Sequence, residues 1–183
     1  MLDASFQSPE VVSGSANSTN DSALRGKPGL DGTISIQHGN RIPLIPRHIA
    51  KLFAEYDISA AWRISGNVIA NGSSFARGNE NNAHRPDGRF YLGSGRSAGF
   101  AVLNLAVLYK PFARLTLNAR VNNVFDTKYS TGAQLGANPL TAHRAFQARL
   151  FGGSAAARYP LQNSTFYAPG APRAFWVSMK YAF

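Results

Sequence analysis

The histidines are the first residues to test for catalytic or metal chemistry. The chain has 4 of them, and they lie in separate segments with no pair four residues apart and no His-Glu-x-x-His run: His38, His48, His84 and His143. Zinc sites usually draw ligands from such short spacings. The absence of cysteine excludes a disulfide scaffold and a Cys-based metal cluster. We expect solvated loop histidines, no metal, no cofactor and no enzyme activity. A metal site assembled in space from separate loops is the less favoured alternative.

Basic side chains offer a second kind of chemistry, because arginine binds anions through several hydrogen bonds at once. The formal net charge is +10. Basic and aromatic residues would suit a ligand that is anionic and aromatic. The candidates for ligand contact are Arg77, Arg85, Arg89, Tyr91, Arg96, Arg120 and Arg144. For each of them the competing explanation is structural, through hydrogen bonds to water or to neighbouring protein.

Nucleic acid is another partner that a basic chain could attract. Here Lys and Arg are spread along the sequence, with no contiguous basic helix or stripe. We therefore predict no nucleic-acid partner, and a soluble basic β protein that binds polyanions is the least favoured alternative.

The carboxy-terminal residues 173–183 show the strand pattern that would position such side chains. Successive side chains of a strand point to opposite faces, so one face here is apolar. That face carries Phe175, Val177, Met179, Tyr181 and Phe183. A strand that ends the chain on an aromatic residue is typical of an outer-membrane β-barrel.

Four further segments alternate in the same way, over residues 47–58, 62–71, 101–110 and 115–122. Each runs about ten residues, the length with which a tilted strand crosses a bilayer. A sixth strand is expected at residues 2–7, cut short by the start of the chain. No apolar run is long enough for a transmembrane helix.

The connections between these segments alternate in length. Short links are expected at residues 57–60 and 110–114, and long loops at 8–45, 72–99 and 126–172. Short turns on one side and long loops on the other are a property of transmembrane barrels. The sequence predicts an all-β fold, an antiparallel transmembrane β-barrel segment of about five to six meander strands.

A motif near the carboxy terminus connects this pattern to a family. It reads Val121, Asn122, Asn123, Val124, Phe125, Asp126, Thr127, Lys128 and Tyr129. The asparagines would bond local backbone, Asp126 would start a turn, and Phe125 would anchor the strand end against neighbouring side chains. The element resembles the V-x-N-L-F-D-x-x-Y motif of TonB-dependent outer-membrane receptors, with Val124 in place of leucine. Residues 42–48 and 169–173 resemble two more passages of the same barrel.

The resemblance covers essentially the whole chain and implies the carboxy-terminal part of a barrel of about 22 strands, over residues 1–183. No secretory signal peptide, plug domain or TonB-binding box is recognisable, so a fragment is expected. The implied function is nutrient uptake, first of a ferric siderophore, with cobalamin, haem, a saccharide or another chelate as alternatives. The implied partners are outer-membrane lipid and lipopolysaccharide, the barrel-assembly machinery that reads the terminal aromatic strand, and TonB. A small autonomous or self-associating barrel, or an adhesin, is the main alternative function.

Overall fold

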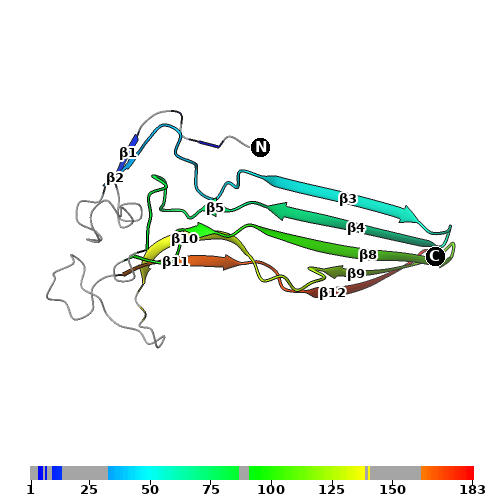
Figure 1. Cartoon of the computed structure of the whole chain (residues 1–183). Helices are drawn as coiled ribbons and strands as arrows, with labels where there is room; N and C mark the ends of the chain where they lie inside the picture. Colours follow the sequence, from blue (N-terminus) through cyan, green and yellow to red (C-terminus); the bar gives the residue numbers. More distant parts are fainter. Residues whose placement is uncertain are drawn as a thin grey trace. The chain divides into compact units, whose positions relative to one another are not determined.

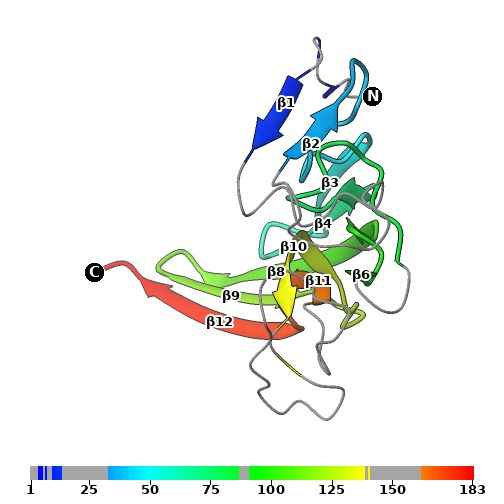
Figure 2. The same ribbon diagram turned by 90° about the vertical axis from the view of Figure 1, so that its left-hand side faces the viewer.

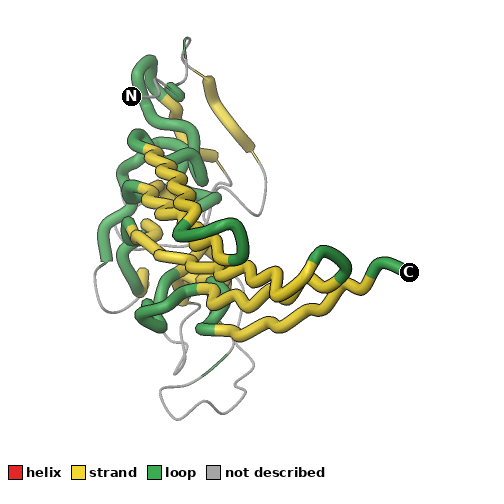
Figure 3. Tube along the Cα trace, turned by 90° about the vertical axis from the view of Figure 1, so that its right-hand side faces the viewer, coloured by secondary structure: helices red, strands yellow, loops and turns green. Residues whose placement is uncertain are grey.

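The computed structural model describes residues 4, 5, 7, 10–13, 33–86, 91–138, 140 and 162–183. Within these ranges the chain forms strands, turns and loops, with no helix (Figure 3). The strands are β1 (Glu10–Ser13), β2 (Thr33–Ile36), β3 (Ile49–Asp57), β4 (Trp62–Asn71), β5 (Ser74–Phe75), β6 (Tyr91–Leu92), β7 (Arg96–Ser97), β8 (Phe100–Phe112), β9 (Leu115–Asn122), β10 (Ser130–Asn138), β11 (Gln162–Pro169) and β12 (Ala174–Tyr181). No helix among the described residues has the length and apolarity to cross a membrane.

The chain divides into two compact units, which are described separately below. The sheet unit comprises residues 48–72, 99–129 and 169–183, and the loop unit comprises residues 1–47, 73–98 and 130–168.

The sheet unit is a five-stranded antiparallel meander with the order β12-β9-β8-β4-β3 (Figure 1). The five full-length predicted strands are confirmed, with ends that differ by a few residues. The expected antiparallel fold is confirmed as well. β3 and β12 are the two edges of this sheet, so the five described strands form an open part of a barrel.

The register confirms the two predicted faces across the sheet. Val177 pairs with Ala119, which pairs with Val107, which pairs with Ile64. Every member of that row belongs to the predicted apolar set. The rows on either side of it point to the opposite face, and that face carries polar pairs such as Asn118 with Ser178 and, further along the strands, Asn67 with Asn104.

The apolar face is exposed in the described chain. Leu52, Val177 and Met179 are 69%, 82% and 71% exposed. A water-soluble sheet would bury such side chains, whereas an outer-membrane barrel presents them to lipid. Trp62 and Tyr109 stack with ring centroids 4.1 Å apart near the hairpin ends, where an aromatic girdle is expected.

Both short links are confirmed as tight hairpins. The β3–β4 turn is closed by Ile58 N–H donating to the Trp62 carbonyl at 3.0 Å. The β8–β9 link is shorter than predicted, because β8 continues to Phe112. The register shifts between Tyr109 and Phe112, where Pro111 lacks an N–H for the ladder.

The loop unit corrects the expectation that the three long connections are without strands. They contain β1 paired with β2 (Figure 2), β5 paired with β7, and a sheet of the order β10-β11-β6. These strands are short or rich in Ser, Thr, Asn and Gly, so they lack the period-two apolar pattern by which the longer strands were predicted. Ala76, Ala133 and Leu135 form a small buried cluster.

Half of the sixth strand expected at residues 2–7 lies outside the described residues, which include only residues 4, 5 and 7 of it. Of its described residues, Ser5 makes a single antiparallel bridge to Arg41. A strand at residues 2–7 is therefore neither confirmed nor excluded.

Candidate ligand-binding site

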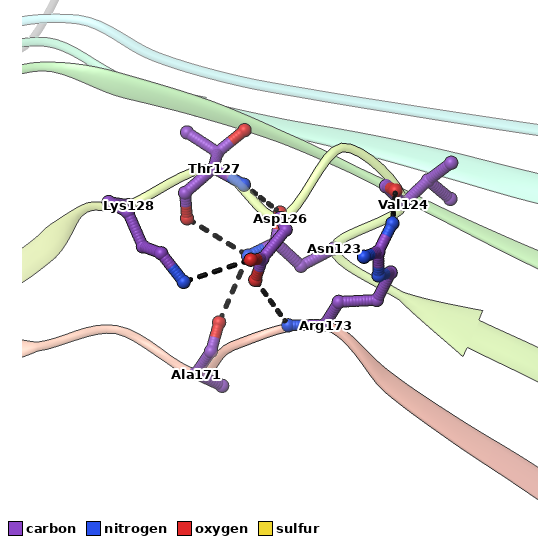
Figure 4. A network of polar contacts seen from close by, with 7 residues as sticks. All are labelled: Asn123, Val124, Asp126, Thr127, Lys128, Ala171 and Arg173. Atoms are coloured by element: carbon purple, nitrogen blue, oxygen red, sulfur yellow. Dashed lines mark hydrogen bonds and ion pairs between the residues drawn. The ribbon is translucent and has the colours of Figure 1, made fainter.

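A tight turn follows β9, at the motif singled out from the sequence (Figure 4). Asn123 is 3% exposed and adopts a positive φ of 51°. Its side-chain amide donates to the carbonyls of Thr127 and Ala171 at 3.0 and 3.1 Å, and its Oδ1 accepts from Thr127 N–H at 2.9 Å. The predicted role of Asn123 in bonding local backbone is confirmed, and the Ala171 bond adds a tie to the segment that leads into β12.

Asp126 lies in the second half of this turn. We use the name loop clasp for the group of residues that is bonded together here: Asn123, Asp126, Lys128, Ala171 and Arg173. Its N–H donates to the Asn123 carbonyl at 2.8 Å, so the predicted turn is present. Its carboxylate accepts from Lys128 Nζ at 2.9 Å and from Arg173 N–H at 3.0 Å. These two hydrogen bonds, that from Lys128 first, hold the pKa of Asp126 below its usual range.

The two aromatic residues of the motif differ. Phe125 was expected to pack against neighbouring side chains, but this is wrong for the described chain, because the side chain is 75% exposed. Tyr129 instead packs on Phe100, with ring centroids 4.3 Å apart. A Cβ placed on Gly170 would lie 2.2 Å from the Tyr129 ring, so a glycine is required beside it.

In the loop unit, two arginines lie over one buried ring. The guanidinium carbon of Arg96 is 4.0 Å from the Phe75 ring centroid, and that of Arg41 is 5.4 Å from it. Phe75 is 6% exposed. Burial, with the nearby charges of Arg96 and Arg47, lowers the pKa of Arg41. The cluster therefore concentrates positive charge that an anion would relieve.

The same unit contains an open-sided hollow of about 360 Å³ with one arginine in its lining. The lining residues are Leu44, Arg77, Gly132, Ala133, Gln134, Phe166, Tyr167 and Ala168. Leu44 holds a φ of 66°, which is strained for a leucine, and its N–H donates to the Phe75 carbonyl at 2.9 Å. The Leu44 side chain is 46% exposed and forms part of the lining of the hollow. This hollow offers an apolar surface, two exposed aromatic rings and one cation.

The ligand-contact candidates lie in different parts of the chain. Arg77, Arg85 and Arg96 lie exposed in the loop unit, whereas Arg120 lies on the polar face of the sheet unit. Arg89 and Arg144 lie outside the described residues. Tyr91 is placed in β6, where its backbone pairs with Asn163 in β11, but its side chain is not among those described.

Sequence reasoning missed Arg41 and Phe75. Neither residue lies in a period-two pattern, and they are 34 positions apart in the chain. The only signal in the sequence was that Arg41 directly precedes the predicted barrel passage at residues 42–48. This position does not predict that Arg41 contacts Phe75.

The structure corrects the prediction for one of the histidines, His84. His38 and His48 are exposed as expected, and His143 lies outside the described residues. His84 was expected to be solvated, but it is 7% exposed, its Nε2 is 3.1 Å from the Gly93 carbonyl oxygen, and a Cβ on Gly95 would lie 2.6 Å from its ring. The loop folds over it because Gly93 and Gly95 both adopt positive φ. The described ranges contain no group of three His, Cys, Asp or Glu side chains able to hold a metal ion.

A comparison with protein families shows to which family the chain is related. Residues 4–124 match the family described as "TonB dependent receptor-like, beta-barrel". The chain belongs to the TonB-dependent receptor β-barrel family. Members of this family are outer-membrane receptors and transporters of Gram-negative bacteria rather than enzymes, and they interact with TonB. No curated protein sequence matches the chain.

Solved structures agree with this TonB-dependent receptor fold. The ferric-catecholate import receptor Fiu of E. coli K12, in its closed form, is similar with a TM-score of 0.50 and 18% identity, over 78% of this chain and 15% of that one. The ferric yersiniabactin uptake receptor FyuA of Yersinia pestis is similar with a TM-score of 0.50 and 17% identity, over 80% of this chain and 18% of that one. The chain thus spans less than a fifth of the length of either receptor.

Proposed function

We propose that this chain is the carboxy-terminal part of the barrel of a TonB-dependent receptor that imports an anionic iron chelate, most specifically a ferric siderophore. The observation that carries the ligand class is the concentration of arginine and aromatic side chains in the loop unit. Arg41 and Arg96 lie over Phe75, and Arg77 shares a hollow with Phe166 and Tyr167. Anionic groups with aromatic rings complement such a surface.

The names of the similar structures support this ligand class. Fiu is a ferric-catecholate import receptor and FyuA a ferric yersiniabactin uptake receptor, so both are named for the import of an iron complex. The loop unit would then receive the ligand from outside the cell. The polar face of the sheet unit would line the lumen, and its apolar face would contact lipid.

The remaining parts of such a receptor define the proposed partners. The five described strands leave both β3 and β12 unpaired on one side, so further strands must close the barrel. A plug and the preceding strands would supply closure and energy coupling through TonB. The terminal strand would engage the barrel-assembly machinery, and outer-loop arginines not used for ligand would contact lipopolysaccharide phosphates.

The first experiment is to translate the DNA immediately upstream of Met1. A plug and earlier barrel strands there, in frame or after a frameshift, would support a receptor. An unrelated gene with its own stop codon would overturn that assignment and favour a small self-associating barrel, which would close the β3 and β12 edges by pairing with other copies.

Uptake tests the ligand class. Cells lacking the complete receptor gene, and cells carrying it on a plasmid, are supplied with ⁵⁵Fe as a tris-catecholate, as a tris-hydroxamate or as ferric citrate. We expect gene-dependent, TonB-dependent accumulation of at least one chelate. Arg77→Gln should weaken binding of that chelate about tenfold, since a hydrogen bond to a charged group contributes about 1.5–3 kcal/mol. Arg114→Gln, in the β8–β9 turn, is the matched control. Accumulation of none of the three would contradict the proposal.

A further inference from the structure

The apolar face of the sheet unit is not evenly covered by side chains. An open-sided groove of about 330 Å³ lies on this face over β3, β4 and β8. We call it the apolar-face groove. It belongs entirely to the sheet unit, and it lies on the side of the sheet that points away from the barrel lumen.

The register explains the floor of the groove, because two small residues of the apolar face fall side by side. Ala54 pairs with Gly66, and Gly66 pairs with Leu105. A Cβ placed on Gly66 would lie 2.9 Å from Leu105 Cδ2. The Leu105 side chain therefore leans toward the space above Gly66, and it bounds the groove on β8.

Larger side chains bound the floor on both sides along the strands. On the side away from the β3–β4 turn, Leu52 pairs with Val68, and Val68 pairs with Leu103. On the side toward the turn, Tyr56 pairs with Ile64. Leu52 and Tyr56 are 69% and 71% exposed, so their side chains stand out from the sheet as walls.

The position of the groove along the strands gives its depth in the membrane. The family is located in the outer membrane, and the short turns of such barrels lie on the periplasmic side. Gly66 is four residues from Trp62, where the stacked rings of Trp62 and Tyr109 mark the aromatic girdle. Four residues of a tilted strand rise about 10 Å along the membrane normal. The groove therefore lies in the hydrocarbon of the periplasmic leaflet and is continuous with the lipid-contacting surface.

The shape of the groove favours a hydrocarbon chain over a protein segment. The two bounding rows are four residues apart, about 13 Å between their backbones before the side chains of either row are counted. A helix with its side chains is about 10–12 Å across, so it does not fit between them. A barrel strand that pairs with β3 would extend the sheet sideways, and it would leave the outward side of Ala54 and Gly66 uncovered.

We propose that the apolar-face groove binds one acyl chain of a phospholipid from the periplasmic leaflet. The chain lies over Ala54 and Gly66, and walls on both sides give it more contacts than the rest of the apolar face offers. Lipid is thus held at one place on the barrel rather than contacting the whole face equally. The inference goes beyond the proposed function, because it depends on the outer-membrane location of the family and not on the imported ligand.

The test uses the outer-membrane protein that contains this chain, reconstituted in vesicles of phosphatidylethanolamine and phosphatidylglycerol. A trace of the phosphatidylethanolamine carries a diazirine near the middle of one acyl chain. After irradiation, mass spectrometry of the peptides locates the cross-links. We expect several-fold more cross-links at the groove walls than at Phe175 and Val177 of β12, which are 71% and 82% exposed on the same face.

Matched variants test whether the floor of the groove holds the lipid. Ala54→Leu fills the floor, keeps the face apolar and should abolish the excess of cross-links. Ala119→Leu makes the same change on the same face outside the lining and should leave the excess unchanged. Gly66→Ala should reduce the excess, because the added Cβ displaces the Leu105 side chain. Heat-modifiable migration on gels checks assembly, and Gly66→Ala carries the test if Ala54→Leu does not assemble.

Three results would overturn the inference. Equal cross-linking of the groove walls and β12 would show that lipid contacts the face uniformly. Fewer cross-links at the groove than at β12 would show that a protein segment covers it. An excess that survives Ala54→Leu, or that Ala119→Leu also removes, would show that the floor does not hold the lipid. Uptake is not measured, so each result is independent of the importer proposal.

Discussion

Asp126 is the titratable residue on which the loop clasp depends. Its pKa is held below the usual range, by Lys128 first and then by the Arg173 N–H. A carboxylate whose pKa is lower in the folded state stabilises that state above the unfolded pKa, which is about 3.9. The stabilisation is lost as the pH falls through the lower, folded pKa.

Asp126→Asn should therefore lower the urea midpoint of the receptor at pH 7, because the ion pair with Lys128 is lost. Below pH 4 the difference from wild type should shrink, since wild-type Asp126 itself becomes protonated. Urea titrations of both proteins in liposomes, at pH 7 and at a pH below 4, measure this difference in midpoint. A difference that is the same at both pH values would show that the carboxylate charge does not contribute.

Gly170 lies too close to the Tyr129 ring for any side chain at this position. A Cβ at this position would lie 2.2 Å from two carbons of the Tyr129 ring. Gly170→Ala should displace that ring from Phe100 and lower the free energy of unfolding by about 1–3 kcal/mol. Gly136→Ala is the matched control, because its nearest contact would be Phe166 at 3.6 Å. Equal urea midpoints for the two variants would contradict the proposed packing.

At the level of the strands, the two faces of the sheet should respond differently to the same charge. Leu117→Arg and Val177→Arg place arginine on the apolar face and should cost roughly 2–4 kcal/mol near the bilayer midplane. Asn118→Arg, adjacent to Leu117 but on the polar face, should be mild. Urea unfolding in lipid vesicles compares the three variants. Equal sensitivity on both faces would indicate a buried water-soluble core instead.

β12 is an edge strand of the sheet, and it leads into the proposed assembly signal at the end of the chain. Phe183 is fully exposed, and Tyr181 contacts it edge-on with centroids 5.3 Å apart. Deletion of Phe183 should reduce the amount of full receptor in the outer membrane, because the terminal aromatic would be read by the assembly machinery. Ala182→Ser is the control for a change at the same end. Normal membrane levels after the deletion would remove Phe183 from that role.

For the molecule as a whole, the open edges of the sheet decide what the 183 residues can do by themselves. Among the strands that the structure describes, β3 and β12 each leave one side unpaired, and an unpaired backbone group in lipid costs several kcal/mol. Expressed alone, the chain should give no heat-modifiable monomer in detergent. Gel migration with and without heating tests this. A stable heat-modifiable oligomer would favour closure by self-association.

The sequence alone was sufficient for the membrane sheet. Period-two alternation encodes which face each side chain takes, so the apolar residues Ile64, Val107, Ala119 and Val177 fall in one row of the register. The motif after β9 likewise revealed its turn, because Asn123 and Asp126 bond neighbours within a few residues. Information that is local and periodic can be read from the chain.

Contacts between distant segments needed the tertiary structure. The Arg41 and Arg96 cations over Phe75, the Gly170 contact with Tyr129 and the burial of His84 all join residues whose spacing follows no period. Short strands such as β5 and β7 have too few residues to show alternation. The row that joins Ser65, Ala106 and Arg120 belongs to this class as well, because it depends on the register, and a one-residue slip would turn these side chains to the other face.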